Sequence, residues 1–217
     1  MAEYHIVSQG EHLSGIAANY GFTSYHEIWD HPNNADLKGK RKNPNVLFPG
    51  DRLFVPDRET GKYSRSTDKR HTFKVKQSPL KLRLVLQDQY EKPIDSANCL
   101  LVVEGDSHKL TTDSQGKLEL VIPPTARSAY LVVQDPEETP HDGIAVSIKI
   151  GDLDPVEEIS GQQARLRNLG YFWGEVDGNS SQDFLSAVEE FQCENQLTVD
   201  GICGPQTQAK LKQEHGC

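Results

Sequence analysis

Residues 4–21 read YHIVSQGEHLSGIAANYG, and this stretch contains two different spacings of apolar residues in succession. Polar and apolar side chains alternate over residues 4–7, which predicts a short β-strand. Farther along, apolar residues recur at the spacing of one helix face: Leu13, Ile16, Ala17 and Tyr20. Gly21 then stands where a helix is expected to end. The stretch therefore predicts a strand that is followed closely by an amphipathic helix.

The rest of this N-terminal segment is expected to return to a second strand. An amphipathic stretch around Ile28 predicts another short helix, and the polar residues 31–43 are expected to form a loop. Residues 45–50 contain a Pro/Gly turn, and RLFVP at 52–56 predicts the closing strand. The expected element order is βααβ, and the expected domain covers residues 1–57.

A polar linker and a β-rich segment are expected to follow. Residues 58–70, RETGKYSRSTDKR, contain almost no apolar side chains and predict a linker. Residues 71–150 contain short apolar runs separated by turn-forming residues, at 80–86, 100–103, 110–112, 118–122, 130–133 and 144–150. This spacing is typical of a small antiparallel β-sandwich. It indicates no site, so the segment is interpreted as a spacer or a docking surface.

The last segment, residues 156–217, is expected to be helical. Its apolar residues fall at helical spacing in three stretches, which contain Leu166 and Leu169; Phe184, Val188 and Phe191; and Thr207 to Leu211. Asp-Gly loops at 177–178 and 200–201 separate these stretches and form a weak internal repeat. The fold class expected for the whole chain is α+β multidomain, with a βααβ module, a central antiparallel β-sandwich and a C-terminal three-helix module.

The charge of the chain argues against several classes of partner. The 217 residues carry a net charge of −9, of which −8 belongs to residues 151–217. Nucleic-acid binding requires clustered Lys and Arg, so no nucleic-acid partner is expected. The basic residues 38–42 are interpreted as a solvated loop. No apolar run is long enough to cross a membrane, and no membrane insertion is expected.

The two parts of the N-terminal segment, YHIVSQGEHLSGIAANYG and NPNVLFPGDRLFVP, resemble the LysM family over residues 4–56. In that family, two loops form a groove for N-acetylglucosamine-containing glycans. The resemblance assigns this role to Gly10, Glu11, His12 and Leu13, facing Asn45, Val46, Leu47, Phe48, Pro49 and Gly50. The chain departs from the family at Glu11 and His12, where Asp and then Thr or Ser are usual, and its stretch 30–43 is longer. The alternative is that the glycines only make turns and that Leu13 and Leu53 only fill the core.

The C-terminal segment resembles the small helical peptidoglycan-binding domain that accompanies many cell-wall hydrolases. The resemblance rests on ARLRNLGYFWGEVDG, FLSAVEEFQ and LTVDGICGPQTQAKL. Its first loop departs from the family at residues 179–181, where a glycine would be usual. The candidate contact residues are Tyr171, Phe172, Trp173, Asp177 and Asp200. The two aspartates equally suit a role in bracing their loops, and Trp173 suits either ring stacking or the core.

The order of these modules is similar to that of LysM proteins associated with type VI secretion and related contractile injection systems. The start, MAEYHIVSQG, lacks the basic and apolar regions of a signal peptide, so synthesis in the cytoplasm is expected. Delivery by an injection system would bring such a chain to the periplasm or to a target cell. Secretion-spike or toxin proteins are then alternative partners to peptidoglycan and its fragments.

No catalytic set is evident. The motifs HExxH, GxSxG and GxxxxGK[ST] are absent, and paired carboxylates such as 137–138, 157–158 and 189–190 are interpreted as hydrated surface. His26, Asp30 and His31 are read as structural or solvated in preference to metal ligands. The cysteines of the last segment, Cys193, Cys203 and Cys217, are expected as free thiols, with a Cys193–Cys203 disulfide as the alternative after export. We expect no cofactor, no metal, and a non-catalytic peptidoglycan-binding protein, with a protein–protein adaptor as the alternative.

Overall fold

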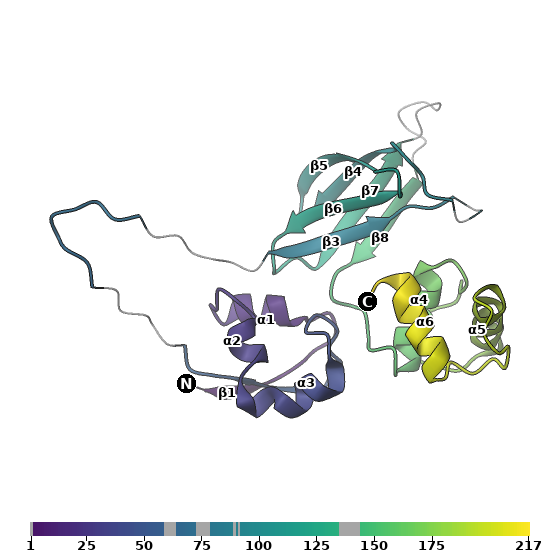
Figure 1. Cartoon of the computed structure of the whole chain (residues 1–217), viewed down its shortest axis with the longest axis horizontal. Coiled ribbons are helices and arrows are strands. Elements are labelled where there is room, and N and C mark those ends of the chain that lie inside the picture. Colours follow the sequence, from purple (N-terminus) through teal and green to yellow (C-terminus); the bar gives the residue numbers. More distant parts are fainter. Residues whose placement is uncertain (1, 59–63, 73–78, 89, 91, 135–143) are drawn as a thin grey trace.

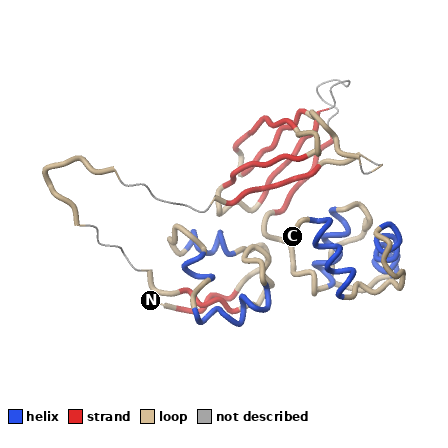
Figure 2. The backbone as a smooth tube through the Cα atoms, in the orientation of Figure 1, coloured by secondary structure: helices blue, strands red, loops and turns tan. Residues whose placement is uncertain are grey.

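The computed structural model describes residues 2–58, 64–72, 79–88, 90, 92–134 and 144–217 (Figure 1). Helices and antiparallel sheets occupy separate parts of the chain, which confirms the α+β class. Figure 2 shows the helices gathered toward both ends of the chain and most of the strands in its middle. No helix in the described ranges combines the length and apolarity needed to span a bilayer.

The N-terminal unit is built around a two-stranded sheet. Strand β1 (Glu3–Ile6) pairs antiparallel with β2 (Arg52–Val55), with Tyr4 opposite Phe54. Between the strands lie α1 (Leu13–Asn19), α2 (His26–Trp29), the 3-10 helix η1 (Pro32–Asn34) and α3 (Ala35–Arg41). A core that includes Leu13, Ile28 and Leu53 joins the helices to the inner face of the sheet.

The structure differs from the sequence-based expectation over residues 31–43, which were expected to form a loop. This stretch contains η1 and α3. Helix α3 shows no clear apolar stripe because the side chain that it buries is Arg41. The Arg41 guanidinium makes two hydrogen bonds to the Asp51 carboxylate, at 2.7 and 2.9 Å, and thereby ties α3 to the start of β2. Residues 58 and 64–70 of the expected linker contain no helix or strand.

The central unit contains two antiparallel sheets. Strand β3 (Leu80–Val85) pairs with β6 (Lys117–Ile122), and a four-stranded sheet has the order β5-β4-β7-β8. The bounds of these four strands are Asp106–Thr111, Asn98–Val103, Ser128–Gln134 and Ile144–Lys149. Leu101, Leu118 and Leu131 are among the buried residues shared by the two sheets. Five of these strands coincide with the apolar runs predicted from the sequence, because inward and outward side chains alternate along a strand. The exception is β5, which shares only its last two residues with the predicted run at 110–112.

The C-terminal unit contains α4 (Ile159–Asn168), α5 (Gln182–Glu194) and α6 (Pro205–His215). Phe184, Val188 and Phe191 of α5 are buried against Leu166 of α4 and Leu211 of α6. Ser181 caps α5 by accepting a hydrogen bond from the Phe184 amide at 3.2 Å. The connections between these helices are the two loops that contain the Asp-Gly pairs.

Candidate functional site

The first loop of the C-terminal unit is held by the side chain of Gln163, a buried residue of α4. Its Nε2 donates to Asp177 Oδ1 at 2.9 Å and to the Asn179 carbonyl at 3.0 Å. Its Oε1 accepts from the amides of Asp177 and Gly178, at 3.1 and 2.8 Å. One side-chain amide therefore satisfies four polar groups of the loop.

The second loop repeats this arrangement around Gln192, a buried residue of α5. Gln192 Nε2 donates to Asp200 Oδ1 at 2.8 Å and to the Ile202 carbonyl at 3.0 Å. Gln192 Oε1 accepts from the amides of Asp200 and Gly201, both at 3.0 Å. The weak repeat in the sequence therefore corresponds to a repeated loop structure.

Both aspartates brace their own loops. Hydrogen bonds from Gln163 and from the backbone and side chain of Asn179 lower the pKa of Asp177 to about 2. The backbone amide of Ile202 and the side chain of Gln192 lower the pKa of Asp200. These carboxylates are ionised and hydrogen-bonded within the unit.

The sequence analysis did not identify the two glutamines as functional residues. The available signal was a polar residue on an apolar helix face, Gln163 three positions before Leu166 and Gln192 four positions after Val188.

The aromatic triplet of the first loop places its three side chains differently. Phe172 is buried and packs edge-on against Phe184, with ring centroids 6.3 Å apart. Tyr171 packs edge-on against Phe191 and donates its hydroxyl proton to Glu194. Trp173 is 90% exposed, so of the three rings it is the one that presents its faces to a ligand.

In the N-terminal unit, the first candidate loop is turned inward. Glu11 accepts a hydrogen bond from the Ser8 amide at 2.9 Å and lies 2.8 Å from His5 Nε2. Burial raises the pKa of Glu11, but these two partners outweigh it and leave the pKa below its usual value. His12 is buried, and its Nδ1 accepts from the Gly15 amide at 3.3 Å, which caps α1. Leu13 is fully buried in the core.

The second candidate loop is bonded to the first. The Leu13 amide donates to the Pro44 carbonyl at 3.2 Å, and the Ser14 hydroxyl donates to Asn45 Oδ1 at 3.0 Å. Val46 and Leu47 are buried, Phe48 and Pro49 are half-buried, and Gly50 is exposed. The Phe48 amide donates to Asp51, and the Arg41 guanidinium lies 5.4 Å from the centre of the Phe48 ring.

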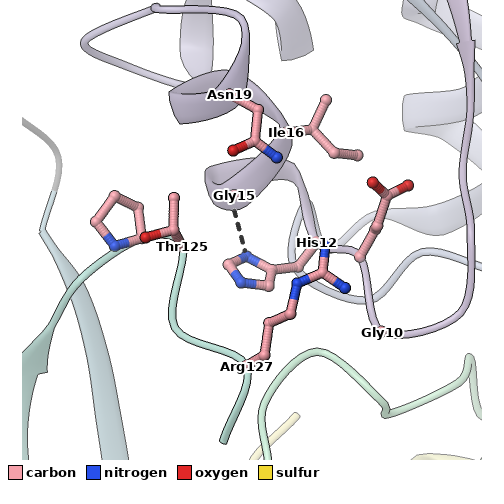
Figure 3. Close-up of a pocket in the computed structure, with 9 residues that line it drawn as sticks. Gly10, His12, Gly15, Ile16, Asn19, Thr125 and Arg127 are labelled. Atoms are coloured by element: carbon pink, nitrogen blue, oxygen red, sulfur yellow. Dashed lines mark hydrogen bonds between the residues drawn. The ribbon is translucent and has the colours of Figure 1, made fainter. Parts of the chain in front are cut away.

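The loop pair also faces the central unit. A pocket of about 130 Å³ lies between α1 and the segment that follows β6. Figure 3 shows Asn19 and Ile16 on the α1 side of this pocket, with Thr125 and Arg127 opposite and His12 between them. Burial lowers the pKa of His12, while a hydrogen bond to the Ala126 backbone acts in the opposite direction. The neutral imidazole therefore links the cap of α1 to the central unit.

The other candidates have structural partners. His26 Nδ1 lies 3.1 Å from Asp30 Oδ2, Asp30 also pairs with Lys38, and His31 Nδ1 accepts from the Asn33 amide. Within the described ranges, no group of three or more His, Cys, Asp or Glu residues is placed to hold a metal ion. Glu157 pairs with Lys212 at 3.2 Å, whereas Glu137 and Glu138 lie outside the described residues. The four cysteines are free thiols.

Comparison with known proteins identifies a family for the C-terminal unit. Residues 156–211 match the sequence model of a family described as "Putative peptidoglycan binding domain". The chain is also similar to the N-acetylmuramoyl-L-alanine amidase CwlM of Mycobacterium tuberculosis, with 40% identity over 55 residues. That match covers 25% of this chain and 14% of the length of the amidase. No solved structure matches the chain. The expected peptidoglycan-binding resemblance of the C-terminal unit is confirmed, and the LysM resemblance of residues 4–56 stays a prediction.

Proposed function

We propose that this chain is a non-catalytic peptidoglycan-binding protein whose C-terminal unit holds it, and any protein attached to it, to the cell wall. The observation that carries the proposal is the family match over residues 156–211, combined with the exposure of the Trp173 side chain on that unit. The match to the amidase relative covers only 14% of the length of that protein, so its enzymatic activity is not carried over.

The contact chemistry is expected to be stacking and hydrogen bonding. An exposed indole offers a flat apolar surface to the face of a sugar ring, together with an N–H donor. Asp177 and Asp200 already accept hydrogen bonds within the unit and are assigned a positioning role. The net charge of −8 on residues 151–217 provides no attraction to an anionic wall polymer.

A pelleting assay with purified bacterial sacculi tests this proposal. We expect the full chain to sediment with sacculi and Trp173→Ala to bind about tenfold more weakly, which corresponds to about 1.4 kcal/mol. Tyr90→Ala is the matched control because Tyr90 is also an exposed aromatic residue, at 71%, but lies in the central unit. Equal sedimentation of Trp173→Ala and the unchanged chain would refute the assigned contact. Absence of sedimentation for the unchanged chain would refute wall binding.

The N-terminal unit is proposed to be LysM-like, with a second glycan site in the loop pair 10–13 and 45–50. The support is its antiparallel β1–β2 sheet with helices between the strands, and the hydrogen bonds that join the two loops. Loop changes such as Pro49→Ala and Gly50→Ala should weaken the binding of soluble N-acetylglucosamine oligomers. Binding that survives both changes would place the glycan elsewhere.

A second candidate function is a protein–protein adaptor that uses wall-binding folds as docking surfaces. The observation that favours it is the burial of His12, Leu13, Val46 and Leu47, which leaves little of the loop pair open to a sugar. Its partner would be a secretion-spike or toxin protein, with delivery of the chain to the periplasm or a target cell by an injection system. This function predicts no sedimentation with sacculi and co-elution with the purified partner in size-exclusion chromatography.

A further inference from the structure

The N-terminal unit and the rest of the chain meet at the loop pair itself. Gln9 Nε2 lies 3.4 Å from both the Asp152 carbonyl and Asp154 Oδ1 in the connector before α4. A Cβ atom on Gly151 would lie 2.7 Å from the Gly10 carbonyl oxygen, so the two backbones are in close contact. A Cβ atom on Gly15 would lie 3.0 Å from the Pro124 carbonyl oxygen. Two segments, 124–127 and 151–154, therefore cover the first candidate loop.

We propose that docking of the N-terminal unit onto these two segments closes its glycan groove, so that docking and glycan binding exclude each other. The inference rests on the proposed LysM-like function of the loop pair. A sugar in this groove needs the backbone groups of Gly10 and the residues beside it, and the connector occupies that side of Gly10. The chain therefore alternates between a closed form and an open, glycan-binding form.

The contact between the N-terminal unit and these two segments has the features of a reversible interface. Among the described residues, its direct hydrogen bonds include the two long ones from Gln9, at 3.4 Å, and the one between His12 and the Ala126 backbone. The contact also encloses a pocket lined by polar groups that include Asn19, Thr125 and Arg127. Such a polar, incompletely filled contact resembles the interfaces between domains that move relative to each other. Residues 56–79 join β2 to β3, and a chain of this length can extend over roughly 80 Å, which leaves room for separation.

The alternation makes a quantitative prediction for ligand affinity. When only a fraction of the molecules is in the binding-competent form, the apparent dissociation constant equals the intrinsic one divided by that fraction. If the closed form accounts for about nine-tenths of the molecules, opening the contact strengthens glycan binding about tenfold. A ligand that binds the open form should in turn separate the units, because binding and opening are coupled in both directions.

Gly15→Leu is the variant that tests the inference in the full chain. Gly15 lies within α1, where leucine is a better helix former than glycine, and the tightest contact of an added Cβ is with Pro124 of the central unit. The matched control is Gly39→Leu in α3, where an added Cβ meets no atom within 4 Å. Gln9→Ala is a milder second variant, which removes the two hydrogen bonds of an exposed side chain.

The measurements are the radius of gyration by small-angle X-ray scattering and the affinity for a soluble N-acetylglucosamine tetramer by calorimetry. We expect Gly15→Leu to increase the radius of gyration and to bind the tetramer about tenfold more tightly than the unchanged chain. Gln9→Ala should change both quantities in the same direction by less, and Gly39→Leu should change neither.

Three results would overturn the inference. The first is an unchanged radius of gyration in both Gly15→Leu and Gln9→Ala. The second is separation of the units with unaltered affinity, which would show that the docked segments do not close the groove. The third is separation without any tetramer binding, which would also remove the glycan site of the N-terminal unit. The loss of sacculus sedimentation caused by Trp173→Ala is measured independently and reports on the contact of the C-terminal unit.

Discussion

Gln163 and Gln192 each satisfy four polar groups of a loop with one side-chain amide, which requires both a donor and an acceptor at the same position. In the unchanged chain, Gln163 Nε2 lies 2.9 Å from Asp177 Oδ1. Gln163→Glu retains the acceptor oxygen but replaces this N–H donor with a second carboxylate oxygen. We expect the melting temperature of the C-terminal unit to fall by about 5 °C or more at neutral pH. The loss should diminish as the pH is lowered, because a shared proton relieves the repulsion between two adjacent carboxylates.

The control for this change is Gln182→Glu, since Gln182 is exposed in the first turn of α5. A negative charge near a helix N-terminus is tolerated, so this variant should melt close to the unchanged chain. Equal melting temperatures for Gln163→Glu and Gln182→Glu would show that the amide network does not stabilise the loop.

His12 makes the N-terminal unit sensitive to acid. Its Nδ1 caps α1 as an acceptor and its pKa is lowered by burial, so the folded state favours the neutral ring. The unfolded chain takes up a proton near pH 6.5, and stability is therefore complete above that pH and falls as the pH drops toward the folded-state pKa. The charged groups that surround the ring are Glu11 and Arg127, and Asp152 lies beside Gly10.

Denaturant unfolding between pH 7 and pH 5 measures this dependence. Fluorescence of the buried Trp29 reports on the N-terminal unit, since Trp173, in the C-terminal unit, is already exposed in the folded chain. His12→Asn retains a capping acceptor without a titrating group, so its stability should lose most of the pH dependence. A slope in His12→Asn equal to that of the unchanged chain would assign the acid sensitivity to another group.

At the scale of elements, α3 is attached by a buried ion pair between Arg41 and Asp51, with 3% and 7% of their side chains exposed. Asp51→Ala leaves the Arg41 cation buried without its partner and should lower the free energy of unfolding by about 3 kcal/mol. The double variant Arg41→Met with Asp51→Ala should be less destabilised than Asp51→Ala alone, because it removes the unpaired charge.

The exposed pair of Asp30 and Lys38 provides the comparison within the same unit, with about half of each side chain exposed. Asp30→Ala should leave unfolding nearly unchanged, since solvent-exposed ion pairs contribute little. Chemical denaturation followed at Trp29 measures all these variants. If Asp51→Ala and Asp30→Ala had the same small effect, the ion pair would not be what holds α3 in place.

At the scale of the whole molecule, the negative charge of the C-terminal unit predicts how binding to the cell wall depends on salt concentration. Proteins that bind polyanions through Lys and Arg lose affinity steeply as salt screens the contact. Residues 151–217 carry −8, so sacculus binding should change by no more than about twofold between about 50 and 300 mM salt. Sedimentation at several salt concentrations measures this, and a strong loss at high salt would shift the contact to the basic residues 38–42.

Much of the fold could be predicted because its signals are local. Short apolar runs located the strands of the central unit except β5, and helical spacing located α1, α4 and α5. The Asp-Gly pairs located both loops of the C-terminal unit, and the quoted motifs indicated its family. These features depend on residues that are neighbours in the chain, so the sequence by itself determined them.

The tertiary structure decided which polar side chains are buried and what covers the candidate sites. Gln163, Gln192 and Arg41 look like surface residues in the sequence, and their hydrogen-bond partners lie up to 16 positions away. Helix α3 escaped prediction because its buried side chain is a charged one. The contact between residues 9–15 and the segments 124–127 and 151–154 joins parts of the chain more than a hundred positions apart. Burial of these polar groups is favourable only because a partner distant in the chain completes their hydrogen bonds. A local sequence pattern cannot identify that partner.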